Sequence, residues 1–304
     1  MVRGAVSVAT RLGVSPLVIG LTLIGFGTST PELATSVQAA LIGSPGIAIG
    51  NIVGSSIANI LLILGISALV APIAVTSSAL KRDGATMIAV AVLFAGLCAV
   101  TQLGRPIGAM FLALLAAYIV YSFRQEQAAP EDHGAAYDKS EAALEVDGAF
   151  RPAEPGSLPW ALAMSLVGLL LIVAGGKLLV DGSVSLARAY GISETIIGLT
   201  IVAIGTSAPE LVTSVVAAMR GHTEVAFGNV VGSNIYNMLG IGGATALIAP
   251  ISAPPEIVRF DNPVMVAVCV LMFIFAWTGF RIGRREGGLL LAGYGVYLAA
   301  LWPS

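Results

Sequence analysis

The chain has 304 residues, of which 57% are hydrophobic and only 11% are charged, and its mean hydropathy is +0.92. This composition excludes an ordinary soluble domain and predicts an all-α, polytopic membrane protein, because the apolar runs reach the roughly 20 residues that cross a bilayer as a helix. The net charge of −2, without clusters of basic residues, gives no indication of nucleic-acid binding.

Nine apolar spans follow one another along the chain, at residues 16–42, 46–71, 84–102, 106–123, 158–181, 193–219, 225–249, 262–280 and 288–302. The segment 124–157 separates the fourth span from the fifth and holds eight of the 17 acidic residues but only three basic ones. We expect it to be a flexible, acidic linker rather than a folded domain.

Basic residues predict how the spans are oriented. Eleven of the 15 Lys and Arg residues fall on the linker side of the nine-span arrangement, three (Arg105, Arg188 and Arg259) fall on the other side, and Lys177 lies within a span. Short cytoplasmic loops hold the excess of Lys and Arg in membrane proteins. The linker is therefore predicted to be cytoplasmic.

A long segment of the chain occurs twice. Residues 27–73 recur at 205–251, an offset of 178, with 28 of 47 positions identical. Five crossings separate a position in the first copy from its counterpart in the second, so the second copy is inverted relative to the first, as in many secondary transporters that build a midplane site from broken helices. The predicted domains are a first repeat at 1–123, the linker at 124–157 and a second repeat at 158–304.

The first repeat is expected to lack its first helix. Extending the offset backwards aligns residue 1 with residue 179, which leaves residues 160–180 without a counterpart. Truncation at the amino terminus and true loss of a helix both explain this. We favour truncation, because loss of one helix would expose the packing faces and polar groups of its neighbours to lipid.

Each copy places one glutamate deep within an apolar span. Residues 27–36 read GTSTPELATS and residues 205–214 read GTSAPELVTS, with the acids at Glu32 and Glu210. A charged carboxylate at mid-membrane costs at least about 2.5 to 3.5 kcal/mol and needs a cation, a proton or water beside it. No lysine or arginine within the repeat cores is expected to neutralise these acids, since Lys177 suits an i,i+4 pair with Asp181 or a snorkelling side chain. The pair therefore indicates a cation site rather than two protonated structural acids.

A proline precedes each glutamate. Pro31 and Pro209 suit the first turn of a new helix and disrupt a continuous one, which predicts breaks at residues 27–30 and 205–208. A simple kink is the alternative, but a kink does not require an acid in both copies. Hard oxygen donors, which suit Na⁺ and Ca²⁺, would then lie beside each glutamate: unwound carbonyls at Gly25, Thr28, Ala203 and Thr206, and the hydroxyls of Ser29 and Ser207.

The second element of each repeat reads GNIVGSSIANILLILG at 50–65 and GNVVGSNIYNMLGIGG at 228–243. Its glycines suit close helix packing. The side chains expected to bind cations share helical faces at i,i+4 spacing, Ser55 with Asn59 and Ser233 with Asn237. For Asn51 and Asn229, interhelical hydrogen bonding and ligation are equally good interpretations.

These paired motifs resemble the two alpha repeats of the cation/calcium exchanger superfamily, nearest its bacterial sodium/calcium exchanger branch, over nearly the whole chain except the linker. The resemblance implies two inverted five-helix repeats with broken helices at the midplane, four central cation sites, and alternating access by sliding of the first and sixth helices. It implies that Glu32 and Glu210 are the main Ca²⁺ ligands, with the carbonyls of Thr28 and Thr206. It also implies Na⁺ sites completed by Ser29, Ser55, Asn59, Ser207, Ser233, Asn237 and the Gly25 and Ala203 carbonyls. Some members have an aspartate where this chain has Asn237, so here two carboxylates would share the site.

The expected function is antiport of Ca²⁺ for Na⁺ in the inner (plasma) membrane of a bacterium, with the two ions and the bilayer as partners and without a cofactor, an enzymatic activity or an obligate protein partner. A Ca²⁺/H⁺ or K⁺-dependent antiporter is the near alternative, because two close carboxylates without a metal favour uptake of a proton. A non-transporting membrane scaffold is a second alternative. An intramembrane enzyme is disfavoured, because His133 and His222 lie outside the spans and the chain carries neither H-E-x-x-H nor G-x-S-x-G.

Overall fold

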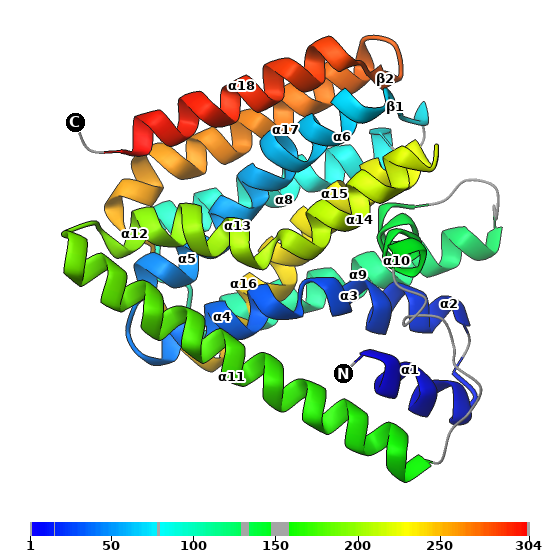
Figure 1. Ribbon diagram of the computed structural model, residues 1–304, viewed down its shortest axis with the longest axis horizontal. Helices are drawn as coiled ribbons and strands as arrows, with labels where there is room; N and C mark the ends of the chain where they lie inside the picture. Colours follow the sequence, from blue (N-terminus) through cyan, green and yellow to red (C-terminus); the bar gives the residue numbers. More distant parts are fainter. Residues whose placement is uncertain (1, 15, 78–79, 129–133, 147–157, 303–304) are drawn as a thin grey trace.

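The computed structural model describes residues 2–14, 16–77, 80–128, 134–146 and 158–302, and nearly all of them are helical (Figure 1). Elements labelled α are α-helices, and those labelled η are short π-helical segments that interrupt them. The first half contains α1 (Val2–Arg11), α2 (Pro16–Ile19), η1 (Gly20–Ile24), α3 (Gly25–Thr28), α4 (Thr30–Leu41), α5 (Pro45–Ala58), η2 (Asn59–Leu64), α6 (Gly65–Val70), η3 (Leu80–Gly84), α8 (Ala85–Val100) and α9 (Arg105–Ala128).

The second half repeats this order after α10 (Ala135–Val146), which lies in the segment between the halves. Its elements are α11 (Leu158–Tyr190), α12 (Glu194–Ile197), η5 (Gly198–Val202), α13 (Ala203–Thr206), α14 (Ala208–Met219), α15 (Thr223–Ile235), η6 (Tyr236–Ile241), α16 (Gly242–Ile248), η7 (Ile257–Asp261), α17 (Asn262–Trp277) and α18 (Arg284–Leu301). The two strands, β1 (Ile73–Ala74) and β2 (Arg281–Ile282), form a short antiparallel pair.

Each predicted apolar span falls on one helix or on consecutive helical segments. Within the described ranges, five helices are long and apolar enough to cross a membrane, and α12–α14 makes a sixth as a pair bent by 49°. The all-helical membrane fold expected from the sequence is thus confirmed, with β1 and β2 as a minor addition.

The predicted breaks are narrower than expected. Helix α3 ends at Thr28 and α4 begins at Thr30, so Ser29 (φ −88°, ψ 8°) alone leaves the helical region, and Ser207 (φ −82°, ψ 7°) does the same between α13 and α14. The expectation of unwound carbonyls was wrong for Ala203, whose carbonyl accepts the N–H of Ser207 at 3.0 Å and so remains within the helix. A single non-helical residue is enough because the proline that follows begins the next helix.

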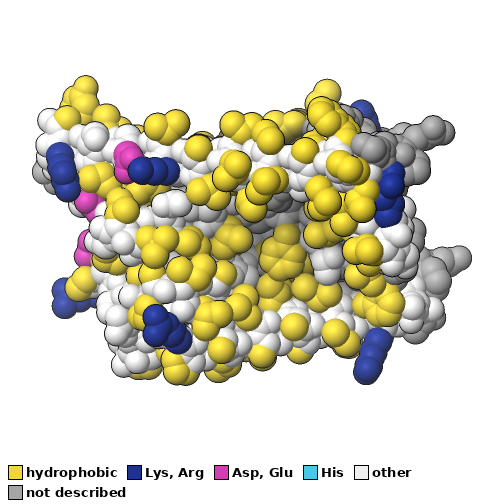
Figure 2. Space-filling view, turned by 90° about the horizontal axis from the view of Figure 1, so that it is seen from below, with side chains coloured by type: hydrophobic (Ala, Val, Ile, Leu, Met, Phe, Trp, Pro, Cys, Tyr) yellow, Lys and Arg dark blue, Asp and Glu magenta, His cyan; other side chains and the backbone are white. Residues whose placement is uncertain are grey.

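Helices α5 and α15 form the centre of the molecule. Every residue of α5 from Gly46 to Ala58 is buried, as is every residue of α15 from Val225 to Ile235. Helix α11 instead runs along one edge of the molecule, where it packs against α1 and α4 (Figure 1). Figure 2 shows a broad band of hydrophobic side chains across one face, with Lys and Arg near its ends, as expected for a surface that meets lipid.

The linker contains one ordered element that the sequence analysis did not predict. Helix α10 packs against α15 and α14 on one side and against η1 and α3 on the other (Figure 1). Residues 134–136, 138–140 and 142–143 are all buried. The expectation of a flexible polar segment therefore does not describe residues 134–146. Residues 129–133 and 147–157 lie outside the described part of the chain, and the domain boundaries at 123 and 158 stay a prediction.

Candidate functional site: a buried cluster of oxygen ligands

The two helix breaks bring Glu32 and Glu210 together at the centre of the molecule. Both side chains are 1% exposed. Ser29 Oγ donates to Glu210 Oε1 at 3.1 Å, and Ser207 Oγ donates to Glu32 Oε1 at 3.2 Å. Each serine thus binds the glutamate of the opposite repeat, which makes the two copies of the motif halves of one site.

Asn51 and Asn229 fix the first turn of the helix that follows each break. Asn51 Nδ2 donates to the Glu32 carbonyl at 3.2 Å and to Ser36 Oγ at 3.0 Å. Asn229 Nδ2 donates to the Glu210 carbonyl at 3.3 Å. Both amide nitrogens therefore hold helix to helix, which supports the hydrogen-bonding interpretation of these residues.

The remaining expected residues line the same buried region, and their contacts differ between the halves. Thr206 Oγ1 donates to Asn51 Oδ1 at 3.0 Å, and Ser55 Oγ donates to the Ala203 carbonyl at 3.4 Å. The symmetry-related residues Thr28 and Ser233 both accept from Lys139 instead. Gly25 is buried at the start of α3.

Asn59 and Asn237 stand at equivalent places, in η2 and η6. Asn59 Nδ2 donates to Asn234 Oδ1 at 2.9 Å, and Asn234 Nδ2 in turn donates to the Ser56 carbonyl at 3.2 Å. These bonds tie the first half of the chain to α15, and the amide oxygens of Asn59 and Asn237 have no hydrogen-bond partner.

Several buried oxygens in this region have no hydrogen-bond partner: Glu32 Oε2, Glu210 Oε2, Asn59 Oδ1, Asn229 Oδ1 and Asn237 Oδ1. Burying an unsatisfied polar atom costs about 1–3 kcal/mol. Carboxylate and amide oxygens are the donors that Na⁺ and Ca²⁺ prefer, so a bound cation would satisfy them. Among the described residues no group of three or more His, Cys, Asp or Glu side chains is arranged to hold a metal ion, so such a site would hold two carboxylates and neutral oxygens.

Lys139 is the functional residue that the sequence analysis missed. Its ammonium donates to Ser233 Oγ at 2.5 Å, to Thr28 Oγ1 at 2.8 Å and to Glu210 Oε1 at 3.3 Å. The prediction concerned only lysines and arginines of the repeat cores and did not consider the linker, from which this positive charge reaches Glu210. A sequence signal existed, because residues 135–146 are rich in helix-forming residues and carry Ala135, Ala136, Ala142 and Ala143 on one helical face.

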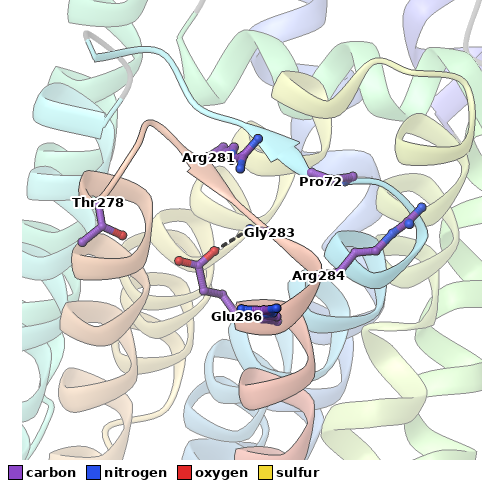
Figure 3. A pocket seen from close by; sticks show the side chains of 7 residues that line it. Pro72, Thr278, Arg281, Gly283, Arg284 and Glu286 are labelled. Atoms are coloured by element: carbon purple, nitrogen blue, oxygen red, sulfur yellow. Dashed lines mark hydrogen bonds between the residues drawn. The ribbon is translucent and has the colours of Figure 1, made fainter.

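A pocket lies at one end of the molecule, between the β1–β2 pair and the start of α18 (Figure 3). Glu286 Oε2 accepts the Gly283 N–H there, and Arg281, Arg284 and Arg285 line the pocket. Three guanidinium groups repel cations, so this pocket does not suit the cation chemistry of the central cluster.

Fold and site together define a class: an internally duplicated, all-helical membrane protein with an oxygen-lined central cluster contributed by both halves. Comparison with known proteins gives the family. The family model described as "Sodium/calcium exchanger protein" matches residues 1–124 and 160–302, and the chain belongs to this family. Its members are transporters rather than a family of enzymes. The two matched segments leave out residues 125–159, and with them α10.

Relatives agree with this assignment. The putative antiporter CaxA of Alkalimonas amylolytica is 38% identical over all of this chain and 93% of its own length. The sodium/calcium exchanger MaX1 of Methanosarcina acetivorans is 38% identical over 99% of this chain and 93% of its own length. Among solved structures, the sodium-calcium exchanger NCX_Mj, soaked with Na⁺ and Sr²⁺, superposes with a TM-score of 0.64 at 32% identity, covering 99% of this chain and 92% of that one.

Proposed function

We propose that this chain is a secondary antiporter that exchanges Ca²⁺ for Na⁺, with both ions bound between Glu32 and Glu210. One observation carries the proposal: each glutamate has one oxygen held by a serine of the opposite repeat and a second oxygen without a partner. Two carboxylates balance one Ca²⁺ or two Na⁺. Because the same oxygens serve either ion, the ions compete, which is the requirement for exchange.

The neutral oxygens around the glutamates complete the proposed ligand set. The hydroxyls of Ser29 and Ser207 already face the glutamates, and the amide oxygens of Asn59 and Asn237 are free to bind an ion. The same set includes Ser55 and Ser233 and the carbonyls of Gly25, Thr28, Ala203 and Thr206. The names of MaX1 and NCX_Mj, both sodium/calcium exchangers, support Ca²⁺ and Na⁺ as substrates.

We infer that transport proceeds by alternating access, with α11 and α1 moving against the rest of the protein. Helix α11 lies at the edge of the fold, and its contacts with α1 and α4 use small residues such as Gly4 and Gly176. Small residues permit close, smooth helix contacts along which one helix can slide. The protein is proposed to lie in a bacterial inner membrane with the segment 124–157 in the cytoplasm.

The direct test is Ca²⁺ uptake into vesicles that contain the purified protein, driven by an outward Na⁺ gradient. We expect uptake with the native chain and loss of about 100-fold or more with Glu210→Gln, because one charge at about 4 Å is worth roughly 4 kcal/mol near a protein surface. Glu224→Gln is the matched control. It makes the same chemical change at an exposed position on α15 and is expected to transport normally.

Other gradients separate the remaining candidates in the same vesicles. Uptake driven by a pH gradient and not by Na⁺ would replace this proposal with Ca²⁺/H⁺ antiport, and a requirement for K⁺ would indicate K⁺-dependent exchange. If no gradient drives uptake and Glu210→Gln leaves the cellular function intact, the membrane-scaffold interpretation stands instead.

A further inference from the structure

Helix α10 brings a positive charge from the linker into the cation cluster. We propose that α10 is a tethered inhibitor: when no ion is bound, the Lys139 ammonium occupies the site, competes with the transported cations and holds the exchanger inactive. This inference rests on the proposed function, because it takes the Glu32–Glu210 cluster as the transport site. It concerns a part of the chain that the family model does not match.

The contacts of Lys139 are those of a bound cation. The side chain is 0% exposed, and its three N–H donors have three oxygen partners, on Ser233, Thr28 and Glu210. The ammonium also lies 5.9 Å from the centre of the Tyr236 ring. A buried ammonium persists only where it is paired and hydrogen-bonded, and this cluster supplies both conditions.

Lys139 breaks the symmetry of the site. In one half, Thr206 Oγ1 donates to Asn51 Oδ1. In the other half, the equivalent hydroxyl of Thr28 is bound by Lys139, and Asn229 Oδ1 is left without a partner. The lysine thus replaces an interaction that the repeat would otherwise make.

Helix α10, which carries Lys139, packs on α15 at the position where a different element packs on the equivalent helix α5 of the first half. On α5, a Cβ added at Gly54 would lie 2.5 Å from the Leu199 carbonyl oxygen of η5. On α15, a Cβ added at the equivalent Gly232 would lie 2.8 Å from the Ala135 carbonyl oxygen of α10. Helix α10 therefore takes the position on α15 that η5 takes on α5. The counterpart of η5 in the first half is η1, and α10 lies between η1 and α15.

This position predicts what release of α10 would do. Once α10 leaves, η1 and α3 can pack directly on α15. This is the arrangement that η5 and α13 already have on α5, so both halves would then have the same geometry around the glutamates. Docked α10 therefore blocks the site in two ways, by its charge and by keeping η1 and α3 away from α15.

Two carboxylates hold the amino-terminal end of α10. The Gly134 N–H donates to Glu126 Oε1 at 2.7 Å, and the Ala135 N–H donates to Asp83 Oδ2 at 3.0 Å. Negative groups at a helix amino terminus are favourable because the first N–H groups lack partners within the helix. Since α10 is part of the same chain, its local concentration at the site is on the order of millimolar, which lets a single lysine compete with free cations.

The test measures how fast Lys139 reacts with a water-soluble amine reagent, detected by mass spectrometry on the full chain in lipid nanodiscs. Lys81, which is exposed at the start of η3, is the internal reference. Without Ca²⁺ or Na⁺, we expect Lys139 to react at least about tenfold more slowly than Lys81, because it must first leave its buried site. Saturating Ca²⁺ is expected to bring its rate close to that of Lys81.

A transport arm shows whether docking inhibits. In the vesicle assay, Lys139→Gln is expected to raise the initial rate of Ca²⁺ uptake at low Ca²⁺ severalfold, and Lys81→Gln, which removes the same charge at an exposed position, is expected to leave it unchanged. Equal uptake by all three proteins would overturn the inhibitory role while leaving the antiporter proposal in place.

The labelling experiment tests whether α10 docks and whether Lys139 competes with cations, even if no transport is seen. Labelling of Lys139 as fast as that of Lys81 in ion-free buffer would show that α10 does not dock, which overturns the inference. If Lys139 is labelled slowly and Ca²⁺ does not change that rate, the proposed competition between Lys139 and Ca²⁺ for the site is overturned. Binding of radioactive Ca²⁺ to the same sample then separates the causes: bound Ca²⁺ contradicts this inference alone, whereas absence of binding removes the proposed function with it.

Discussion

At the scale of single residues, the site depends on side chains that orient others. Asn229 Nδ2 reaches the Glu210 carbonyl and also donates to Thr213 Oγ1 at 2.9 Å and to Ser214 Oγ at 2.8 Å. These bonds hold the first turn of α14 against α15 and so aim Glu210 at the cluster. The sequence left hydrogen bonding and ligation equally open for this residue; in the structure its amide nitrogen has a positioning role, and its amide oxygen has no hydrogen-bond partner.

Substitution of Asn229 by Asp separates these roles. An aspartate keeps the shape but loses the donor, so we expect a loss of about 1–3 kcal/mol in stability against thermal unfolding and weaker Ca²⁺ binding. Asn229→Ala is expected to behave similarly. Tighter Ca²⁺ binding by the Asn229→Asp protein, measured by calorimetry, would show instead that this residue is a ligand.

At the scale of elements, the broken helices could be predicted, whereas the burial of α10 against the rest of the protein could not. Pro31 and Pro209 act within their own helices, so local sequence is enough to place the breaks. The burial of α10 depends on contacts far along the chain, such as that of Lys139 with Glu210, 71 residues away. A polar composition indicates that a segment cannot form a core of its own, but not whether another part of the chain supplies one.

Helix α10 includes a buried acid that opposes docking. Burial, followed by repulsion from Asp83, Glu141, Glu126 and Glu224, raises the pKa of Asp138 well above its usual value, while Arg82 near Gly134 is the neighbouring positive group. A carboxyl with a raised pKa takes up a proton more readily in the docked state. Docking is therefore expected to tighten as the pH falls through this pKa and to loosen as the pH rises through it.

Replacement of Asp138 by Asn should remove this dependence. At alkaline pH, we expect Lys139 in Asp138→Asn to react severalfold more slowly with the amine reagent than in the native chain, with Lys81 again as the reference. At acidic pH, where the native Asp138 is protonated, the two proteins are expected to react alike. Faster labelling of the variant at alkaline pH would show that the carboxylate helps docking rather than opposing it.

At the scale of the whole molecule, hydrogen bonds between loops show which loops share an end of the molecule. Ala74 N donates to Thr223 Oγ1, and Ile73 pairs with Ile282, which gathers the loops after α6, α14 and α17 at one end. Leu103 pairs with Ile251 at the other end. The loop basic residues divide between these ends as the sequence predicts, although which end faces the cytoplasm remains a prediction.

Single cysteines test that orientation, because the native Cys98 and Cys269 are both buried. Gln102 and Arg285 are exposed at opposite ends. In intact cells, we expect a membrane-impermeant thiol reagent to label Gln102→Cys directly and Arg285→Cys only after the membrane is permeabilised. The reverse pattern would place the linker outside the cell.

The central claim is that Glu32 and Glu210, from inverted halves of the chain, form one cation site. Calorimetry of Ca²⁺ binding to the full chain in nanodiscs tests it most directly, with Glu32→Gln, Glu210→Gln and the control Glu224→Gln. The account predicts that either of the first two substitutions alone abolishes high-affinity binding, whereas the control binds as the native chain does. Binding that survives each single substitution, or that falls by half with each, would contradict a shared site.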